Sequence, residues 1–132
     1  DILSVVDRNS LSVDVKLNPS GENDSNFLFE KIINKYQYKN TNVIYGHFAE
    51  LIVKNYQIII IDYLGTDILN YVLALNICVV IYNPNFDELR INKEIKNDLI
   101  KRCYIVKNKI ELESILIKYR NGDLQSKWTD YF

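Results

Sequence analysis

The order of hydrophobic and polar residues predicts a series of short strands along the chain. Residues 11–17 alternate apolar and polar side chains, which is typical of a strand with one buried face, and the turn-forming residues 18–21 follow them. Residues 42–45 predict a second short strand, which Gly46 ends. Residues 57–61 are isoleucine at every position after Gln57, and residues 77–82 are apolar throughout, as expected for strands in the middle of a sheet that is covered on both faces.

Helical patterns fill most of the space between these strands. The expected helices cover residues 24–36, 47–55, 65–75 and 109–119, and Asn121-Gly122 should end the last of them. Residues 86–100 have the pattern of a polar helix or a mixed loop, residues 102–106 that of a fifth short strand, and a final short helix should begin at Asp123. Strands that alternate with helices favour a parallel sheet. We therefore expect an α/β fold, a Rossmann-like three-layer sandwich with a mostly parallel sheet of about five strands, built by residues 1–132 as a single domain.

Composition narrows the classes of protein that this chain can represent. With 132 residues, 48% of them hydrophobic, the chain can bury a substantial core. Its 16 basic and 17 acidic residues nearly cancel, which argues against a general electrostatic binder of nucleic acid. The lack of methionine indicates that the chain begins downstream of an initiator. Because no secretory pattern begins the chain and no apolar run approaches a membrane span, we expect a cytoplasmic protein.

Cysteines and short motifs give no positive signal for redox, metal or nucleotide-hydrolysing chemistry. Cys78 and Cys103 lie in apolar runs and are expected to be small buried hydrophobes, without a zinc site or a disulfide. The chain has no GxGxxG, GxxxxGKS, CxxC, HExxH or GxSxG motif. We therefore expect neither a cofactor nor a bound metal.

Three polar segments should meet at the carboxyl ends of the strands, where ligands bind in open α/β sheets: residues 16–21, 62–67 and 82–85. In the second segment, the backbone N–H groups of Gly65, Thr66 and Asp67 open a helix and can bind an anion. Alternatively, Thr66 only caps its own helix. The carboxylates of Asp62 and Asp67 would repel a bare phosphate, and they suit a diphosphate flanked by sugar hydroxyls better.

Three further residues have both a functional and a structural interpretation. Lys16 can pair with a phosphate or remain solvated, and Tyr82 can stack on a base or sugar or belong to the core or its rim. His47 follows a predicted strand end and faces the same side. As the only histidine it cannot form a metal cluster, and a structural role at the start of a helix is the alternative.

Residues 62–84, with the loop residues Asp62, Tyr63, Gly65 and Thr66 followed by Leu69, Leu73 and Ala74, resemble the C-terminal half of GT-B glycosyltransferase-like proteins. The similarity is greatest to bacterial surface-polysaccharide transferases and CDP-glycerol-type transferases, and it extends over residues 11–132. Residues 15–20 resemble the K-x-H-P-S segment of that family. Asn18 replaces the family's usual His, and Asn70 replaces an acidic residue. An amide can bind a hydroxyl but cannot carry a proton.

The resemblance implies a function for these segments. It implies that the chain binds an activated sugar or polyol nucleotide as half of a cell-surface polysaccharide glycosyltransferase. The implied substrate-binding residues are Lys16, Asn18, Pro19, Ser20, Asp62, Tyr63, Gly65, Thr66 and Asp67, with His47 and Tyr82 as further candidates. The family's enzymes work between two domains, so a preceding acceptor domain is an implied partner and these residues alone should transfer nothing. Association with the inner face of the membrane and self-association through exposed sheet edges are further expectations.

Two alternatives remain from the sequence. One is a non-catalytic α/β regulatory or interaction module. Receiver-like chemistry needs paired acids and a lysine at strand ends, and the chain offers Asp62 and Lys107 without the paired acids after the first strand. The other alternative is a fragment of a nucleoside-diphosphate-sugar epimerase.

Overall fold

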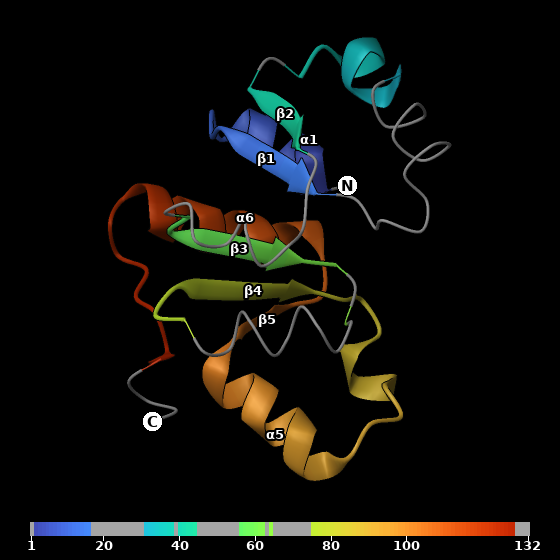
Figure 1. Cartoon of the computed structure of the whole chain (residues 1–132), viewed down its shortest axis with the longest axis vertical. Helices are drawn as coiled ribbons and strands as arrows, with labels where there is room; N and C mark the ends of the chain where they lie inside the picture. The colour runs from blue at the N-terminus through green and yellow to red at the C-terminus, as the bar shows by residue number, and fades with distance from the viewer. Residues whose placement is uncertain are drawn as a thin grey trace. The chain divides into compact units, whose positions relative to one another are not determined.

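The computed structural model describes residues 2–16, 31–38, 40–44, 56–62, 64 and 75–128. The chain divides into two compact units, Asp1–Phe48 and Ala49–Phe132. Each unit has a parallel sheet of its own (Figure 1). The helices predicted over residues 47–55 and 65–75 lie outside the described residues except for Leu75, which is not helical.

The first unit contains a two-stranded sheet. Helix α1 (Ile2–Arg8) precedes strand β1 (Val13–Lys16), which pairs in parallel with β2 (Thr41–Ile44) from Val13 opposite Thr41 to Lys16 opposite Ile44. Both predicted strands are confirmed. Of the helix predicted over residues 24–36, the described part is helical at residues 31–36. Helix α1, which buries Leu3, Val5 and Val6, was not predicted.

The second unit contains a three-stranded parallel sheet in the order β3-β4-β5. Its strands are β3 (Ile58–Ile61), β4 (Cys78–Tyr82) and β5 (Tyr104–Val106), all three close to their predicted positions. β4 pairs on both sides, and Val79, Val80 and Ile81 in it are at most 1% exposed. The continuous apolar run over residues 77–82 thus forms a central strand, as its pattern predicted.

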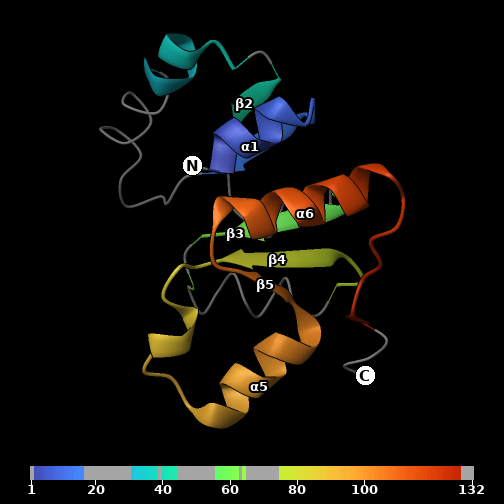
Figure 2. The same cartoon turned by 180° about the vertical axis from the view of Figure 1, so that it is seen from behind.

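Helices complete the core of the second unit. The 3₁₀ turn η2 (Phe86–Glu88) and helix α5 (Lys93–Arg102) connect β4 to β5, so the predicted mixed segment contains both elements. Helix α6 (Lys109–Arg120) lies across one face of the sheet (Figure 2). The core side chains from these elements are Phe86, Leu99, Leu112 and Leu116.

The end of the described chain differs from its prediction. Residues 123–126 have no regular structure, so a helix does not begin at Asp123. This segment forms hydrogen bonds with the rest of the second unit in place of the backbone hydrogen bonds of a helix. The Tyr104 hydroxyl donates to the Gln125 carbonyl at 2.5 Å, and the Ser126 hydroxyl donates to the Ile77 carbonyl at 3.0 Å.

The α/β class and the parallel pairing of the strands are confirmed, but the single sheet of about five strands is not. The described strands form one sheet of two and one of three. An apolar run indicates that a strand is buried, but it does not indicate which strand lies beside it. The sequence pattern therefore located the strands without fixing how they divide between sheets.

Candidate functional site

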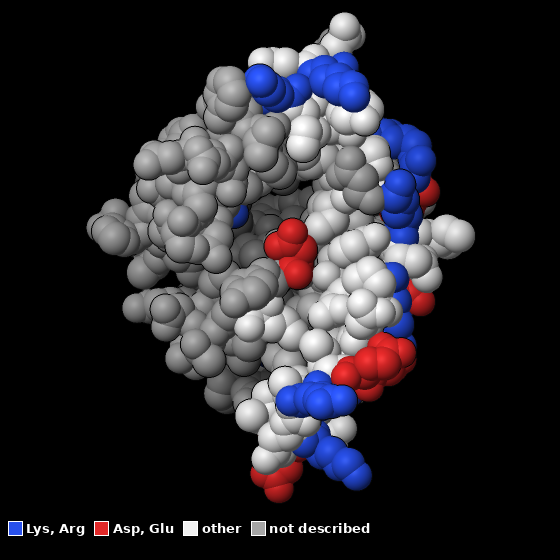
Figure 3. Space-filling model, turned by 90° about the vertical axis from the view of Figure 1, so that its right-hand side faces the viewer, with Lys and Arg blue, Asp and Glu red and all other residues white. Residues whose placement is uncertain are grey.

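The polar segments of the second unit gather at the carboxyl edge of its sheet. Because β3, β4 and β5 are parallel and adjacent, the residues that follow them emerge at the same edge. Asp62 follows β3, Asn83 follows β4 and Lys107 follows β5. Figure 3 views the molecule from the side toward which β3 and β4 point in Figure 1, and the described residues there include both acidic and basic side chains.

Two predicted site residues are brought to neighbouring positions at this edge. Ile61 pairs with Ile81, so Asp62 and Tyr82 take the next equivalent positions on adjacent strands. Tyr82 also pairs with Val106 of β5. Asp62 is exposed and Tyr82 is half-buried. A carboxylate and an aromatic ring that is partly accessible therefore lie at the same level of the sheet.

The turn after β4 is held by its own asparagine. The Asn83 N–H donates to the Val106 carbonyl at 2.9 Å, which extends the pairing with β5 beyond Tyr82. The Asn83 Oδ1 accepts from the Asn85 N–H at 2.8 Å, as in an Asx turn. These bonds fix the Tyr82–Asn85 segment against the end of β5.

An ion pair and a second lysine fasten η2 beside this turn. The Lys107 Nζ lies 2.5 Å from the Asp87 carboxylate, and this hydrogen bond lowers the pKa of Asp87 and raises the pKa of Lys107. Both side chains are exposed enough for solvent to screen the pair, so its value for stability is small. The Lys96 Nζ donates to the Asp87 carbonyl at 2.7 Å and lies 5.5 Å from the centre of the Phe86 ring.

Sequence reasoning had singled out Lys107 but not its pairing with Asp87. The two residues are twenty positions apart, and no local pattern links them. Only the parallel pairing of β4 with β5 brings the segments that follow these strands together. The contact could have been predicted from sequence only if β4 and β5 had first been assigned as neighbouring strands.

The remaining predicted site residues lie in the first unit or outside the described residues. Lys16 ends β1 in the first unit, where it pairs with Ile44. The others lie outside the described residues: Asn18, Pro19, Ser20, His47, Tyr63, Gly65, Thr66 and Asp67. The anion site at Gly65–Asp67 therefore remains a prediction.

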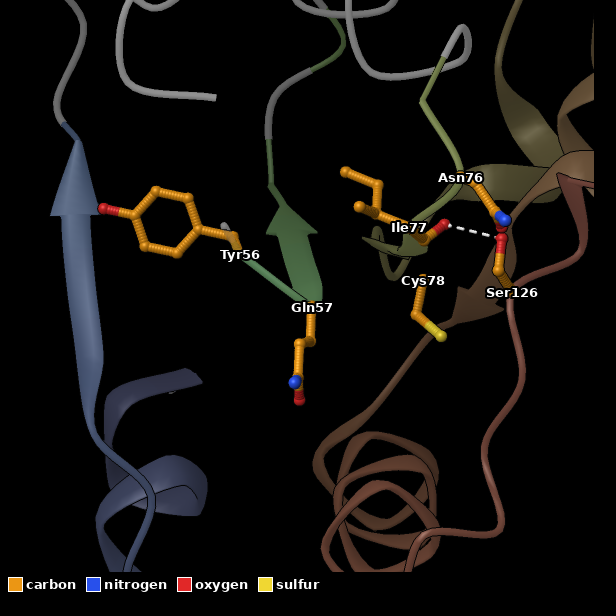
Figure 4. A pocket seen from close by; sticks show the side chains of 6 residues that line it. All are labelled: Tyr56, Gln57, Asn76, Ile77, Cys78 and Ser126. Carbon is orange, nitrogen blue, oxygen red and sulfur yellow. Dashed lines mark hydrogen bonds between the residues drawn. The ribbon is translucent and has the colours of Figure 1, made fainter. Parts of the chain in front are cut away.

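A hollow of about 400 Å³ lies at the opposite, amino edge of the same sheet. It is lined by Tyr56, Gln57, Asn76, Ile77, Cys78 and Ser126. Figure 4 shows that Tyr56 and Asn76 point away from each other. The Gln57 side chain accepts a hydrogen bond from the Tyr119 hydroxyl at 3.0 Å, and Ser126 donates to the Ile77 carbonyl. The polar groups of the hollow therefore do not converge on a common point. In a specific small-molecule site they would converge.

A buried guanidinium stands next to this hollow. Arg102 has no exposed surface, and its Nη1 and Nη2 each donate to the Ile77 carbonyl at 3.2 Å, while Nη2 also donates to Leu75. Burial lowers the pKa of Arg102. Sequence reasoning missed this residue, because it placed Arg102 at the start of the strand predicted over residues 102–106, and arginine side chains are mostly exposed.

The cysteines of this region are confirmed as free and buried. Burial raises the pKa of Cys78 and raises that of Cys103 to about 11. Both thiols therefore stay protonated at neutral pH and are poor nucleophiles. Among the described residues, no cluster of three or more His, Cys, Asp or Glu side chains could hold a metal ion.

No protein-family model matches the chain, and no curated protein or solved structure is significantly similar to it. None of the helices in the described part of the chain has the length and apolar character needed to cross a bilayer.

Proposed function

We propose that the chain binds an activated sugar or polyol nucleotide, as the nucleotide-binding part of a bacterial cell-surface polysaccharide glycosyltransferase. The supporting observation is the carboxyl edge of the β3-β4-β5 sheet, where Asp62 follows β3, Tyr82 ends the neighbouring parallel strand β4 and Asn83 follows it. This edge is where ligands bind in open α/β sheets. The proposal includes a Rossmann-like arrangement of the complete protein and a location at the cytoplasmic face of the membrane.

Each residue at this edge has chemistry suited to one part of such a ligand. The half-buried Tyr82 ring can stack on a base or a sugar, and the Asp62 carboxylate can accept hydrogen bonds from sugar hydroxyls. The diphosphate would bind the backbone N–H groups of Gly65, Thr66 and Asp67, as the sequence predicts. Transfer would then proceed by positioning and by stabilising the diphosphate, with the general base supplied by an acceptor domain.

Thermal unfolding in the presence of UDP, CDP, GDP and CMP tests the proposal. At least one nucleotide should raise Tm, because a ligand that binds only the folded state stabilises it. Thr66→Ala should abolish the rise, and Tyr82→Leu and Asp62→Ala should reduce it. Matched controls are Tyr119→Leu, a half-buried tyrosine whose hydroxyl bonds Gln57 at the amino edge of the same sheet, and Asp98→Ala, at an exposed position of α5. No response to any nucleotide, or an equal loss in the controls, would contradict the proposal.

A non-catalytic interaction module is the second candidate. One observation favours it: helix α6 carries Ile110 and Ile117 with 80% and 38% of their surface exposed. The two isoleucines are seven residues apart and so lie on the same side of the helix, where exposed apolar side chains can contribute to a docking surface. This candidate predicts binding of a protein surface rather than of a nucleotide.

A further inference from the structure

The helix that precedes β2 ends in a turn that holds two tyrosines side by side. Its described part covers residues 31–36 (drawn in cyan in Figure 1). Gln37 has a positive φ of 53°, and the N–H groups of Gln37 and Tyr38 donate to carbonyls within the helix at 3.4 Å and 3.2 Å. This is a Schellman ending, with glutamine at the position that usually belongs to glycine. The turn stacks the Tyr38 ring on the Tyr36 ring, with 5.8 Å between their centres and 22° between their planes, so the two rings form one aromatic surface.

These rings continue an exposed apolar surface along the helix. Ile32 and Tyr36 are 40% and 56% exposed, and residues four positions apart are neighbours on the surface of a helix. Tyr38, stacked on Tyr36, is half-buried. We call the side chains of Ile32, Tyr36 and Tyr38 the tyrosine patch. Apolar side chains that adjoin one another in this way, rather than lying singly, are typical of surfaces that contact another molecule.

The charged residues of this segment are all basic. Lys31 and Lys35 are exposed on the same helix, and the Lys35 Nζ lies 5.5 Å from the centre of the Tyr36 ring. A cation near an aromatic ring keeps its charge and its N–H donors. The sequence contains no acidic residue between Glu30 and Glu50, although the whole chain has a net charge of −1. The positive charge is therefore local, and a partner that complements it is anionic.

The geometry of the aromatic pair distinguishes between two kinds of anionic partner. A nucleic-acid base binds by stacking on an open ring face. Tyr38 already covers one face of the Tyr36 ring, the Lys35 Nζ lies near the same ring, and Tyr38 is itself half-buried. The exposed parts of the pair suit the interface between water and lipid instead, where a tyrosine lies among the headgroups with its hydroxyl toward water.

We propose that the tyrosine patch binds the surface of an anionic lipid bilayer. Ile32 and the two rings enter the headgroup region, and Lys35 binds lipid phosphate groups there. Binding through so small a patch is weak, reversible and sensitive to salt, because a single short anchor does not hold a protein on a membrane by itself. This binding mode rests on the membrane location given in the proposed function, and it does not depend on nucleotide binding at the sheet of the second unit.

Sedimentation with lipid vesicles tests the proposal. The unmodified chain should bind vesicles of equimolar phosphatidylglycerol and phosphatidylcholine at least about tenfold more strongly than vesicles of phosphatidylcholine alone, and high salt should remove the difference. Lys35→Gln should weaken binding about fivefold, and Ile32→Asn should weaken it comparably. The matched controls Lys101→Gln and Ile95→Asn alter exposed residues of α5 and should leave binding unchanged. Circular dichroism of all four variants checks that the fold is kept.

Fluorescence tests whether the patch enters the lipid. Tyr36→Trp places an indole in the patch, and brominated phosphatidylcholine in the same vesicles should quench its emission. The unmodified chain, whose only tryptophan is Trp128, supplies the background signal. Equal binding to neutral and anionic vesicles, patch variants that bind like their controls, or a Tyr36→Trp signal that brominated lipid leaves unchanged would overturn the proposal.

Two further measurements separate this proposal from its neighbours. Binding of a polyuridine oligonucleotide that Lys35→Gln and Ile32→Asn both weaken, without binding of vesicles, would assign the patch to nucleic acid and would also overturn the proposal. The rise in Tm with nucleotide is measured on the same variants. A rise that persists where vesicles do not bind would refute the lipid contact alone, and vesicle binding without any rise would refute nucleotide binding alone.

Discussion

Arg102 shows how a single buried charge organises the second unit. Its guanidinium donates to the backbone carbonyls of Leu75 and Ile77, and Ile77 is the residue before β4. It comes from the end of α5, where the helix dipole favours a cation. Its fork of N–H donors adds hydrogen bonds to both carbonyls, of which Leu75 also accepts from the Ile77 N–H and Ile77 also accepts from the Ser126 hydroxyl. The residue therefore connects the last turn of α5 to the start of the central strand.

Replacing this guanidinium should be costly. We expect Arg102→Met to lower the free energy of unfolding by about 2–4 kcal/mol, because burial is retained while the donors to two carbonyls are lost. Urea unfolding measures the change. Lys101→Met, at the exposed neighbouring position of the same helix, is the control and should change stability by less than about 0.5 kcal/mol. Equal effects in the two variants would show that the buried hydrogen bonds contribute little.

Cys103 gives the protein a predictable weakness in alkali. Burial raises the pKa of its thiol from 9.0 to about 11. The unfolded chain therefore releases this proton before the folded one does. The resulting stabilisation is complete below about pH 9 and is lost as the pH rises toward about 11, with a total of at most about 3 kcal/mol. Unfolding free energies measured across this range should fall more steeply for the unmodified chain than for Cys103→Ala. The lysines and tyrosines titrate in both proteins, so only the Cys103 thiol should make the two curves differ. Parallel curves would contradict the prediction.

Among the elements, α6 has both ends fixed by local hydrogen bonds. At its start the Asn108 Oδ1 accepts from the Glu111 N–H at 2.9 Å, and the Glu111 carboxylate accepts from the Lys107 N–H at 2.6 Å. At its end, Gly122 adopts a positive φ of 77°, and the N–H groups of Gly122 and Asp123 donate to the carbonyls of Tyr119 and Lys118. This is the Schellman arrangement that glycine favours.

Loss of the amino-terminal cap should destabilise α6 by a typical amount. Asn108→Ala removes the acceptor for the Glu111 N–H and should lower the free energy of unfolding by about 1 kcal/mol. Asn97→Ala is the control, because Asn97 is exposed in the interior of α5, where alanine is the better helix former. Chemical denaturation of the two variants gives the comparison. An Asn108→Ala protein as stable as the control would mean that the cap is dispensable.

These local devices explain which elements could be predicted from sequence. The Asn121-Gly122 stop and the amphipathic period before it placed α6 within one residue at its end. The continuous apolar run over residues 77–82 likewise placed β4 within one residue at each end. Helix α1 was missed because its seven residues are too few for a reliable period, although Leu3 and Val6 have helical spacing, and because its two adjacent valines are β-branched.

At the scale of the whole molecule, pairing between distant segments was beyond the sequence pattern. The Asp87–Lys107 pair and the hydrogen bonds of Arg102 join residues twenty or more positions apart. The strands divide into two sheets, but their sequences contain no feature that assigns each strand to its neighbour. Of the candidate site, the proximity of Asp62 to Tyr82 followed from parallel strands alone. The general rule for α/β sheets thus located the edge, while the contacts that shape it required the structure.

The two sheets should differ in how readily they open. β4 is paired on both sides, and its residues Val79, Val80 and Ile81 are at most 1% exposed. In the two-stranded sheet, by contrast, no residue of β1 or β2 is fully buried. Opening free energy follows burial and pairing, and a two-stranded sheet is marginal by itself.

We therefore expect native-state hydrogen exchange to be slowest in β4 and faster in β1 and β2, with opening free energies lower by at least about 2 kcal/mol in the two-stranded sheet. The amide of Val80 should exchange near the rate of global unfolding, whereas the amide of Val13, although it donates to the Asn40 carbonyl at 2.9 Å, should exchange through local opening. Denaturant dependence separates the two, because only global opening exposes enough surface to accelerate strongly with urea. Equal protection and equal urea dependence at both amides would show that the two units unfold as one cooperative body.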